Sequence, residues 1–251
     1  MAYQEKALTL LQKQAGVRVS FCFYLVVPQD QDVGAHPQRS GIFQAVRDFV
    51  TKRILGKTKW ESRVPVPPLP KLPLHCRRDG RFSVLLLPES EQLLRSLQLH
   101  ALVNFTNHIL RGEILSIPEY GVWSYHHGDP REFRGFPPGF WEIYQGAPYT
   151  GAILQKLEHR LDDGVVLRKL TFPTIHHSYY RQREALFSIS VPWLSEVARD
   201  ILSNSPPPMS KTETDVVGPI YTRATHLELL KFLFILLENK LRRLFKSSRL
   251  R

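Results

Sequence analysis

The sequence predicts an α/β fold in which a mostly parallel sheet is flanked by helices, and three observations support this class. The chain has 251 residues, 43% of them hydrophobic and 23% charged, which suits a globular protein with a substantial core. Segments with helical spacing alternate with short runs rich in β-branched and aromatic residues. The longest run, 17–27, is nearly continuous in apolar character, as in a strand buried in a parallel sheet.

The N-terminal third contains two predicted helices, at 3–14 and 41–55, on either side of that strand. Cys22 lies within the apolar run and is predicted to be a core residue. Residues 64–74 are dense in proline, which fixes the backbone and lacks an N–H, so regular structure is not expected there. We interpret this segment as an extended, irregular excursion of the chain away from the regular elements, in preference to a polyproline segment that binds a partner.

The rest of the chain supplies the remaining elements of the alternation. Ser178 and Pro192 are favourable helix starts, and the segment 205–224 is expected to be a linker. Strands are predicted at 81–88, 100–105, 120–126, 150–159 and 164–172, and helices at 89–97, 112–115, 137–146, 178–190, 192–202 and 225–245.

The start of the chain departs from the usual order of an open α/β fold. Such folds begin with a central strand and a glycine-rich turn before the first helix, whereas this sequence begins directly in a helix. Either the fold differs or the N-terminus has been shortened, for instance by a start codon assigned too late.

The net charge of +11 is concentrated at one end of the chain. Residues 240–251 contain six Lys and Arg and no acid, so the rest is only mildly basic and is not interpreted as a nucleic-acid binder. The final helix is apolar almost all round over 227–237 and then basic. Docking on a domain or an oligomer contact is preferred to lying on an anionic membrane surface.

Targeting signals and cysteine usage predict a cytoplasmic protein. Two cysteines in a chain of this length give no disulfide framework, which suits a reducing compartment. The N-terminus does not have the pattern of a signal peptide, and no apolar stretch is long enough to span a membrane.

The stretch "WSYHHGDPREFRG", 123–135, is the densest polar cluster and follows a predicted strand. Ligands gather beyond the carboxyl ends of parallel strands, so His126 and the distant Asp162 could meet in one cleft. A metal site is not predicted, because His126 and His127 point to opposite faces of a strand and no zinc spacing is present. The sequence also contains no G-x-S-x-G elbow, Walker A motif or G-x-G-x-x-G.

Three motifs in order resemble the folate-dependent formyltransferase family, which includes methionyl-tRNA, glycinamide ribonucleotide and sugar N-formyltransferases. They read "SYHHGDPREFRG", "PPGFWEIYQG" and "YTGAILQKLEHRLDDG". The resemblance is good over 99–174 and loose over the N-terminal third, and the "HHGD" form looks most like the sugar and bacterial branches. It implies a Rossmann-like formyltransferase domain over 1–204, which would lack its first strand, then the linker 205–224 and a basic helix over 225–251.

The resemblance also implies a reaction and a set of residues. His126 and Asp162 take the catalytic histidine and aspartate positions, and Ser124 replaces the catalytic asparagine, which is a departure from the family. The formyl donor would be 10-formyltetrahydrofolate. The acceptor would be the primary amine of a small molecule, in particular a nucleotide-linked amino sugar. Residues expected around substrate and folate are His127, Asp129, Arg134, Gly135 and Asn104.

Alternatives to this interpretation stay open. Because Ser124 is a shorter donor than asparagine, the chain could instead be a catalytically lapsed binding protein. A methionyl-tRNA enzyme is disfavoured, because nothing after Thr174 resembles the several short strands of its second domain. For Arg134, Gly135 and His127, shaping the loop or packing in the core is the simpler role. The sequence leaves the oligomeric state open.

Overall fold

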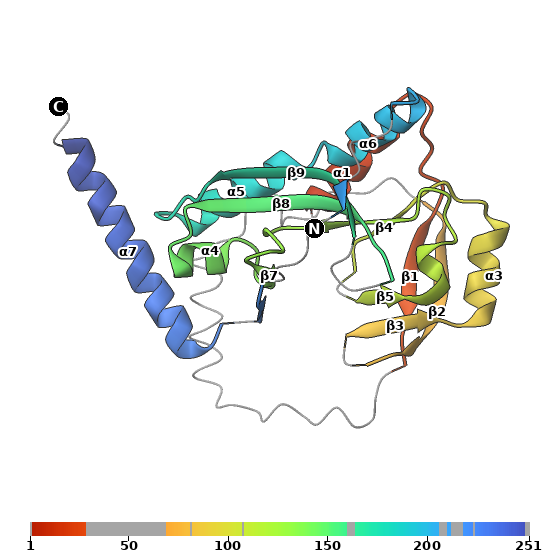
Figure 1. Ribbon diagram of the computed structural model, residues 1–251, viewed down its shortest axis with the longest axis horizontal. Coiled ribbons are helices and arrows are strands. Elements are labelled where there is room, and N and C mark those ends of the chain that lie inside the picture. Colours follow the sequence, from red (N-terminus) through yellow and green to blue (C-terminus); the bar gives the residue numbers. More distant parts are fainter. Residues whose placement is uncertain are drawn as a thin grey trace.

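The computed structural model describes residues 2–28, 69–80, 82–106, 108–159, 164–205, 210–211, 218–222 and 224–248. Three predictions lie outside these ranges: the helix at 41–55, most of the proline-rich segment, and the catalytic position of Asp162. The described chain alternates helices and strands, which confirms the α/β class (Figure 1).

One sheet of four strands lies at one end of the molecule (Figure 1). Its order is β1-β2-β3-β5, with β1–β2 and β3–β5 parallel and β2–β3 antiparallel. Leu74, Leu94 and Ile114, each at most 2% exposed, join this sheet to its helices. The elements are β1 (Cys22–Val26), β2 (Lys71–Arg78), β3 (Ser83–Leu86), α3 (Pro88–Ser96), β5 (Ile109–Arg111) and the 3-10 helix η3 (Gly112–Leu115).

A second sheet of five strands has the order β10-β9-β8-β6-β4. The β4–β6 pair is parallel, whereas β6–β8, β8–β9 and β9–β10 are antiparallel. A separate parallel pair joins β7 to β11. The strands are β4 (Leu102–Asn104), β6 (Val122–His126), β7 (Arg134–Gly135), β8 (Tyr149–Lys156), β9 (Val165–Pro173), β10 (Ser210–Lys211) and β11 (Ile220–Tyr221).

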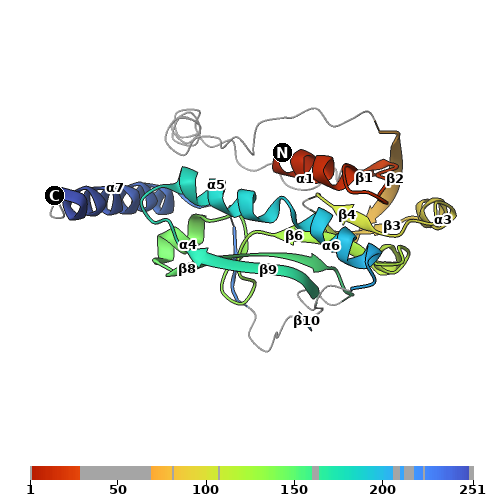
Figure 2. The ribbon, with the colours of Figure 1, turned by 90° about the horizontal axis from the view of Figure 1, so that it is seen from above.

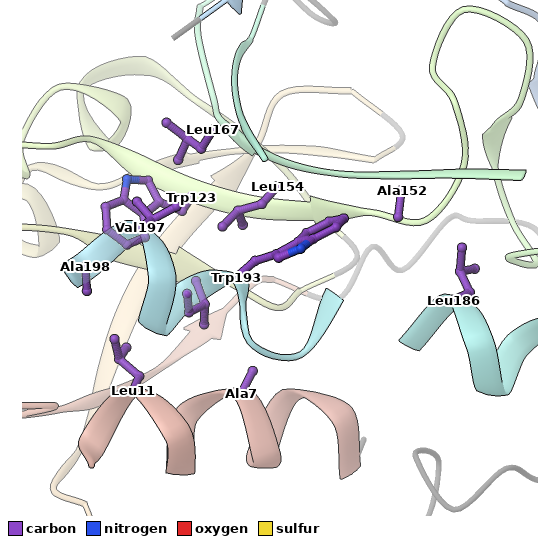
Figure 3. Packing of buried hydrophobic residues seen from close by; sticks show 11 residues of the cluster. Ala7, Leu11, Trp123, Ala152, Leu154, Leu167, Leu186, Trp193, Val197 and Ala198 are labelled. Atoms are coloured by element: carbon purple, nitrogen blue, oxygen red, sulfur yellow. The ribbon is translucent and has the colours of Figure 1, made fainter. Parts of the chain in front are cut away.

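Helices α1 (Ala2–Gln12), α5 (Tyr179–Ser190) and α6 (Trp193–Leu202) cover one face of the five-stranded sheet (Figure 2). Alternate strand residues point toward these helices and form the core drawn in Figure 3. The other face of β6 and β8 is therefore left for side chains with different roles. The core residues are Ala7, Leu11, Trp123, Ala152, Leu154, Leu167, Leu186, Trp193, Leu194, Val197 and Ala198.

Helices α4 (Phe140–Gln145) and α7 (His226–Ser248) lie at the end of the molecule opposite to α3 (Figures 1 and 2). The Phe140 and Phe232 rings stack with their centroids 4.0 Å apart, and Tyr179 meets Phe232 edge-on at 5.4 Å. Phe232 is fully buried, so it fixes the inner face of α7 on α4.

Two predictions in the N-terminal region were wrong, and both errors have a physical reason. Cys22 is exposed because, among the described strands, β1 pairs with β2 alone, and each of its residues keeps part of its surface exposed. The proline-rich segment includes the start of β2, although no regular structure was expected there. Pro73 is tolerated because β3 pairs only with Cys76–Arg78, which leaves a strand neighbour on just one side of Pro73.

The segment expected to be a linker contains two short strands. β10 extends the five-stranded sheet beside β9, and β11 pairs with β7. The terminal helix predicted after this segment is α7.

Candidate functional site

Strand β6 divides its side chains between two environments. Trp123 packs in the core under the helices, and the ring of Tyr125 packs on that core. Ser124 and His126 therefore project from the opposite face. Both are half-buried, at the end of a strand whose neighbours are β4 and β8.

His127 belongs to the helix side and not to the face of His126. Its ring meets Tyr3 of α1 at 5.1 Å and Phe187 of α5 at 4.9 Å, both edge-on. Its Nε2 lies 3.0 Å from the Oγ of the buried Ser190. Burial and the neighbouring His126 lower the pKa of His127 to about 3, so the ring is neutral at physiological pH. These contacts are those of a packed core residue.

A row of three polar residues crosses the sheet at Ser124. Strand register pairs Ser124 with Asn104 of β4 and with Gln155 of β8, and paired residues project from the same face. The Asn104 side-chain carbonyl accepts hydrogen bonds from the backbone N and the Oγ1 of Thr106, both at 2.9 Å. Within the described part of the chain, the side chains of Ser124 and Gln155 have no hydrogen-bond partner. An amide and a hydroxyl are thus available next to each other.

Sequence reasoning did not single out Gln155. It lies in an otherwise apolar strand, and only the register of β8 against β6 places it opposite Ser124. A polar residue in the run 149–156 was a signal, but without the register it could not be assigned to a face.

The loop after β6 folds back onto His126. The Nε2 of His126 lies 3.1 Å from the carbonyl oxygen of Phe133. If Nε2 donates to this carbonyl, it carries the proton and the tautomer is fixed. Gly128 permits the approach, because a Cβ there would lie 2.5 Å from the same oxygen and 3.3 Å from His126 Nε2. The "HHG" sequence is therefore explained by sterics at this turn.

Asp129 holds the loop together by charge. It is 8% exposed, accepts hydrogen bonds from the Arg131 backbone and guanidinium, and lies 3.2 Å from Lys169 Nζ. Burial alone would raise the pKa of Asp129. The hydrogen bonds from Arg131 and the charge of Lys169 outweigh burial and lower the pKa to about 2. Asp129 is thus ionised, and two cations surround a single carboxylate.

Arg134 and Gly135 form β7 and pair with β11. Gly135 has φ 101°, and a Cβ there would lie 2.0 Å from the carbonyl oxygen of Tyr221. Only glycine allows this approach. The glycine of the "RG" motif is therefore accounted for by the docking of β11.

Asp162 lies outside the described residues, but the ends of its turn are placed. Lys156 and Val165 are paired, and this pair closes the turn one residue beyond Gln155. Gly164 is buried, and a Cβ there would lie 2.8 Å from Gln155 Oε1. The turn that carries Asp162 thus starts beside the row of Asn104, Ser124 and Gln155.

Two further structural findings concern the described residues only. No group of three or more His, Cys, Asp and Glu side chains among them could hold a metal ion. None of their helices is both long enough and apolar enough to cross a membrane.

No family model matches the chain. Among curated proteins, methionyl-tRNA formyltransferase of Prochlorococcus marinus strain MIT 9215 is 39% identical over 59 residues, covering 24% of this chain and 18% of the relative. The same enzyme of strain AS9601 is 37% identical over 59 residues, with the same coverage. The match therefore spans less than a fifth of the length of these relatives. They confirm the resemblance to the folate-dependent formyltransferase family over about a quarter of the chain.

Two solved structures show a looser likeness. WlaRD, a sugar 3N-formyltransferase crystallised with dTDP and 5-N-formyl-THF, is 12% identical with a TM-score of 0.44, covering 93% of this chain and 75% of that chain. The N-formyltransferase of Helicobacter canadensis, in complex with folinic acid and dTDP-3-aminofucose, is 10% identical with a TM-score of 0.40, covering 87% and 81%.

Proposed function

We propose that this chain transfers a formyl group from 10-formyltetrahydrofolate to a primary amine, with the end of β6 as the reaction site. The observation that carries the proposal is that Ser124, His126 and Gln155 project from the face of β6 and β8 opposite to the core under α1, α5 and α6. The motif series that contains Ser124 and His126, together with the similarity to methionyl-tRNA formyltransferases, supports the reaction class.

The reaction requires hydrogen-bond donors and a proton acceptor. A bond forms between the amine nitrogen and the formyl carbon, and the bond from that carbon to the folate nitrogen breaks. The proton lost by the amine is passed to the leaving folate nitrogen. Donors must point at the formyl oxygen as it gains negative charge. We assign this role to His126, which would exchange its contact with the Phe133 carbonyl for the formyl oxygen, assisted by the Ser124 hydroxyl and the Gln155 amide. Asp162 would orient His126 and help to move the proton.

Gln155 could replace the amide that is missing because Ser124 stands where the family has an asparagine. A hydroxyl is shorter than a carboxamide, and loss of one oxyanion donor can cost about 3 kcal/mol. Cβ atoms of directly opposed residues on antiparallel strands lie about 5 Å apart, within reach of the longer glutamine side chain. Gln155 would then supply the amide that asparagine supplies in the family.

The acceptor we favour is a small amine that carries phosphate, as in a nucleotide-linked amino sugar. Arg131 and Lys169 both form ion pairs with Asp129 and so place two cationic side chains beside the loop. Positive charge near a site raises the local concentration of anionic substrates. Asn104, Arg134 and the loop glycines would shape the pocket for substrate and folate.

Release of tetrahydrofolate from 10-formyltetrahydrofolate, measured with a panel of nucleotide-linked amino sugars, tests the activity. The His126→Ala variant should lose turnover by at least 10²-fold. His100→Ala is the matched control, because its side chain is 81% exposed at the start of β4. Absence of both folate binding and turnover in the wild type would refute the proposal.

Two alternatives have distinct outcomes in the same assay. A lapsed binding protein would bind folate without turnover, and Ser124→Asn should then raise activity. A methionyl-tRNA enzyme, suggested by the curated relatives, would formylate methionyl-tRNA and no amino sugar. In an active enzyme, Gln155→Leu should lower kcat and Ser124→Asn in the same chain should restore it. No loss in the Gln155→Leu variant would remove that residue from the mechanism.

A further inference from the structure

We propose that α7 is a dimerisation helix that pairs in an antiparallel sense with α7 of a second copy of this chain. The helix has 23 residues and two apolar faces. The inner face is covered, since Phe232 is fully buried and Leu229, Leu233 and Leu236 pack beside it on the α4 core. The outer face is exposed, and its large apolar side chains keep between 44% and 79% of their surface accessible.

The outer face is a regular stripe, not a scatter of exposed residues. Its members are separated alternately by three and four positions, which is the spacing of a coiled-coil seam. α7 lies at the end of the molecule in both ribbon views (Figures 1 and 2), where another subunit can approach this face. The stripe consists of Leu227 (79% exposed), Leu230 (61%), Phe234 (68%), Leu237 (55%), Leu241 (44%) and Leu244 (57%).

The stripe is self-complementary when two copies run antiparallel. A two-fold axis midway between positions 234 and 237 places Phe234 opposite the partner's Leu237. The same axis pairs Leu230 with the partner's Leu241 and Leu227 with the partner's Leu244. Every large residue of the stripe then meets another, as required of a surface that binds its own copy.

The charges beside the seam select this orientation. In the antiparallel pair, Lys231 lies opposite the partner's Glu238, and the two-fold axis repeats this ion pair. A parallel pair would instead place His226 beside the partner's Lys231 and Lys240 beside the partner's Phe245, with no acid against a base. The antiparallel arrangement also opposes the two helix dipoles. Lys231 and Glu238 are both exposed, so a second copy can reach them. Within one chain the Lys231 ammonium lies 4.9 Å from the Tyr144 ring centroid and Glu238 is 2.6 Å from the Arg242 guanidinium, so the proposed ion pair shares these side chains with those contacts.

An anionic membrane surface is the other occupant that an apolar stripe and basic flanks could suit. The acidic Glu238 borders the stripe and would face the lipid headgroups, which favours a protein partner. The experiment below distinguishes binding to a membrane surface from pairing with a second copy of the chain.

The test is the mass of the full chain by size-exclusion chromatography with light scattering, over a concentration series in reductant so that the exposed Cys22 forms no disulfide. The wild type should be a dimer that dissociates on dilution, and Phe234→Glu should be a monomer. Single reversals Lys231→Glu and Glu238→Lys each create two like-charge pairs and should raise the dimer Kd about tenfold. The double reversal should bind more tightly than either single reversal, although it loses the contacts of Glu238 with Arg242 and of Lys231 with Tyr144.

Circular dichroism of each variant checks that α7 remains helical. A wild type that is monomeric across the series overturns the proposal, as does a double reversal that is weaker than both single reversals. Phosphatidylserine vesicles form the second arm. A monomeric wild type that binds these vesicles, with binding lost in Phe234→Glu, would identify a membrane-surface helix instead. None of these outcomes depends on formyl transfer.

Discussion

Glu142→Gln should stabilise the protein at alkaline pH and have little effect at acid pH. Glu142 lies in α4 and is 2% exposed, and its Oε1 has no hydrogen-bond partner among the described residues. Burial, aided by the nearby charge of Glu132, raises the pKa of Glu142 from 4.5 to about 7. The protonated acid is nearly the shape of glutamine, so the variant mimics the form that the core accepts.

The magnitude follows from proton linkage. Because the folded-state pKa is raised, the contribution of Glu142 is fully present below pH 4.5 and is lost as pH rises through 7. A shift from 4.5 to about 7 corresponds to about 3 kcal/mol at roughly 1.4 kcal/mol per pKa unit. The variant should therefore match the wild type near pH 4.5 and exceed it by up to about 3 kcal/mol at pH 8.

Urea denaturation of both proteins at several pH values measures this difference. Glu89→Gln is the control, because Glu89 is exposed at the start of α3 and its loss should change stability by no more than about 0.5 kcal/mol at any pH. A wild type and Glu142→Gln pair whose stabilities differ by a constant amount from pH 4.5 to 8 would refute the linkage argument.

Three further predictions concern packing. Phe232→Ala removes a fully buried ring and should lower the free energy of unfolding by about 3–5 kcal/mol. Phe234→Ala, on the exposed face of the same helix, should lower it by less than about 0.5 kcal/mol in urea titrations of dilute protein. Equal losses would contradict the docking of α7. The pKa of His127 is about 3 when folded and 6.5 when unfolded, so stability is present above pH 6.5 and falls by up to about 5 kcal/mol towards pH 3. His127→Phe should flatten this acid limb, and an unchanged limb would mean that another group causes it. Gly135→Ala brings a Cβ against the Tyr221 carbonyl, at a position with left-handed backbone, and should lower the free energy of unfolding by about 1–3 kcal/mol. Amide hydrogen exchange at 220–221 should accelerate. Unchanged protection there would show that β11 tolerates the Cβ.

Much of the secondary structure could be predicted because it is encoded locally. Alternation in the sequence placed β6, β8 and β9, and the hydroxyl of Ser178 accepts a hydrogen bond from the Arg181 backbone at the start of α5, as expected of a helix cap. The short strands β5, β7, β10 and β11 were missed. Strands of two or three residues are defined by their partners, and their own sequences carry no periodicity.

In the candidate site, too, residues within one motif could be predicted from the sequence, whereas residues brought in from distant strands could not. The motifs placed Ser124 and His126 on one strand face, and in the structure that face is opposite to the core under α1, α5 and α6. Gln155 and Lys169 were missed because Gln155 joins the site through strand register, 31 positions from Ser124, and Lys169 through an ion pair, 40 positions from Asp129. The burial of Glu142 was equally hidden, since an acid in the first turn of a helix is expected at the surface.

Successive residues at the end of β6 have two different roles: one set packs against helices, and the other faces the proposed reaction site. Tyr125 and His127 pack against α1 and α5, whereas Ser124 and His126 face the row that contains Gln155. A change on the helix side should therefore alter the free energy of unfolding, and it should reach the site only by moving the strand. Changes to Ser124 or His126 should alter unfolding less, because these two side chains project away from the apolar cluster under the helices. If this face is catalytic, activity and stability should respond to different members of the four consecutive residues 124–127.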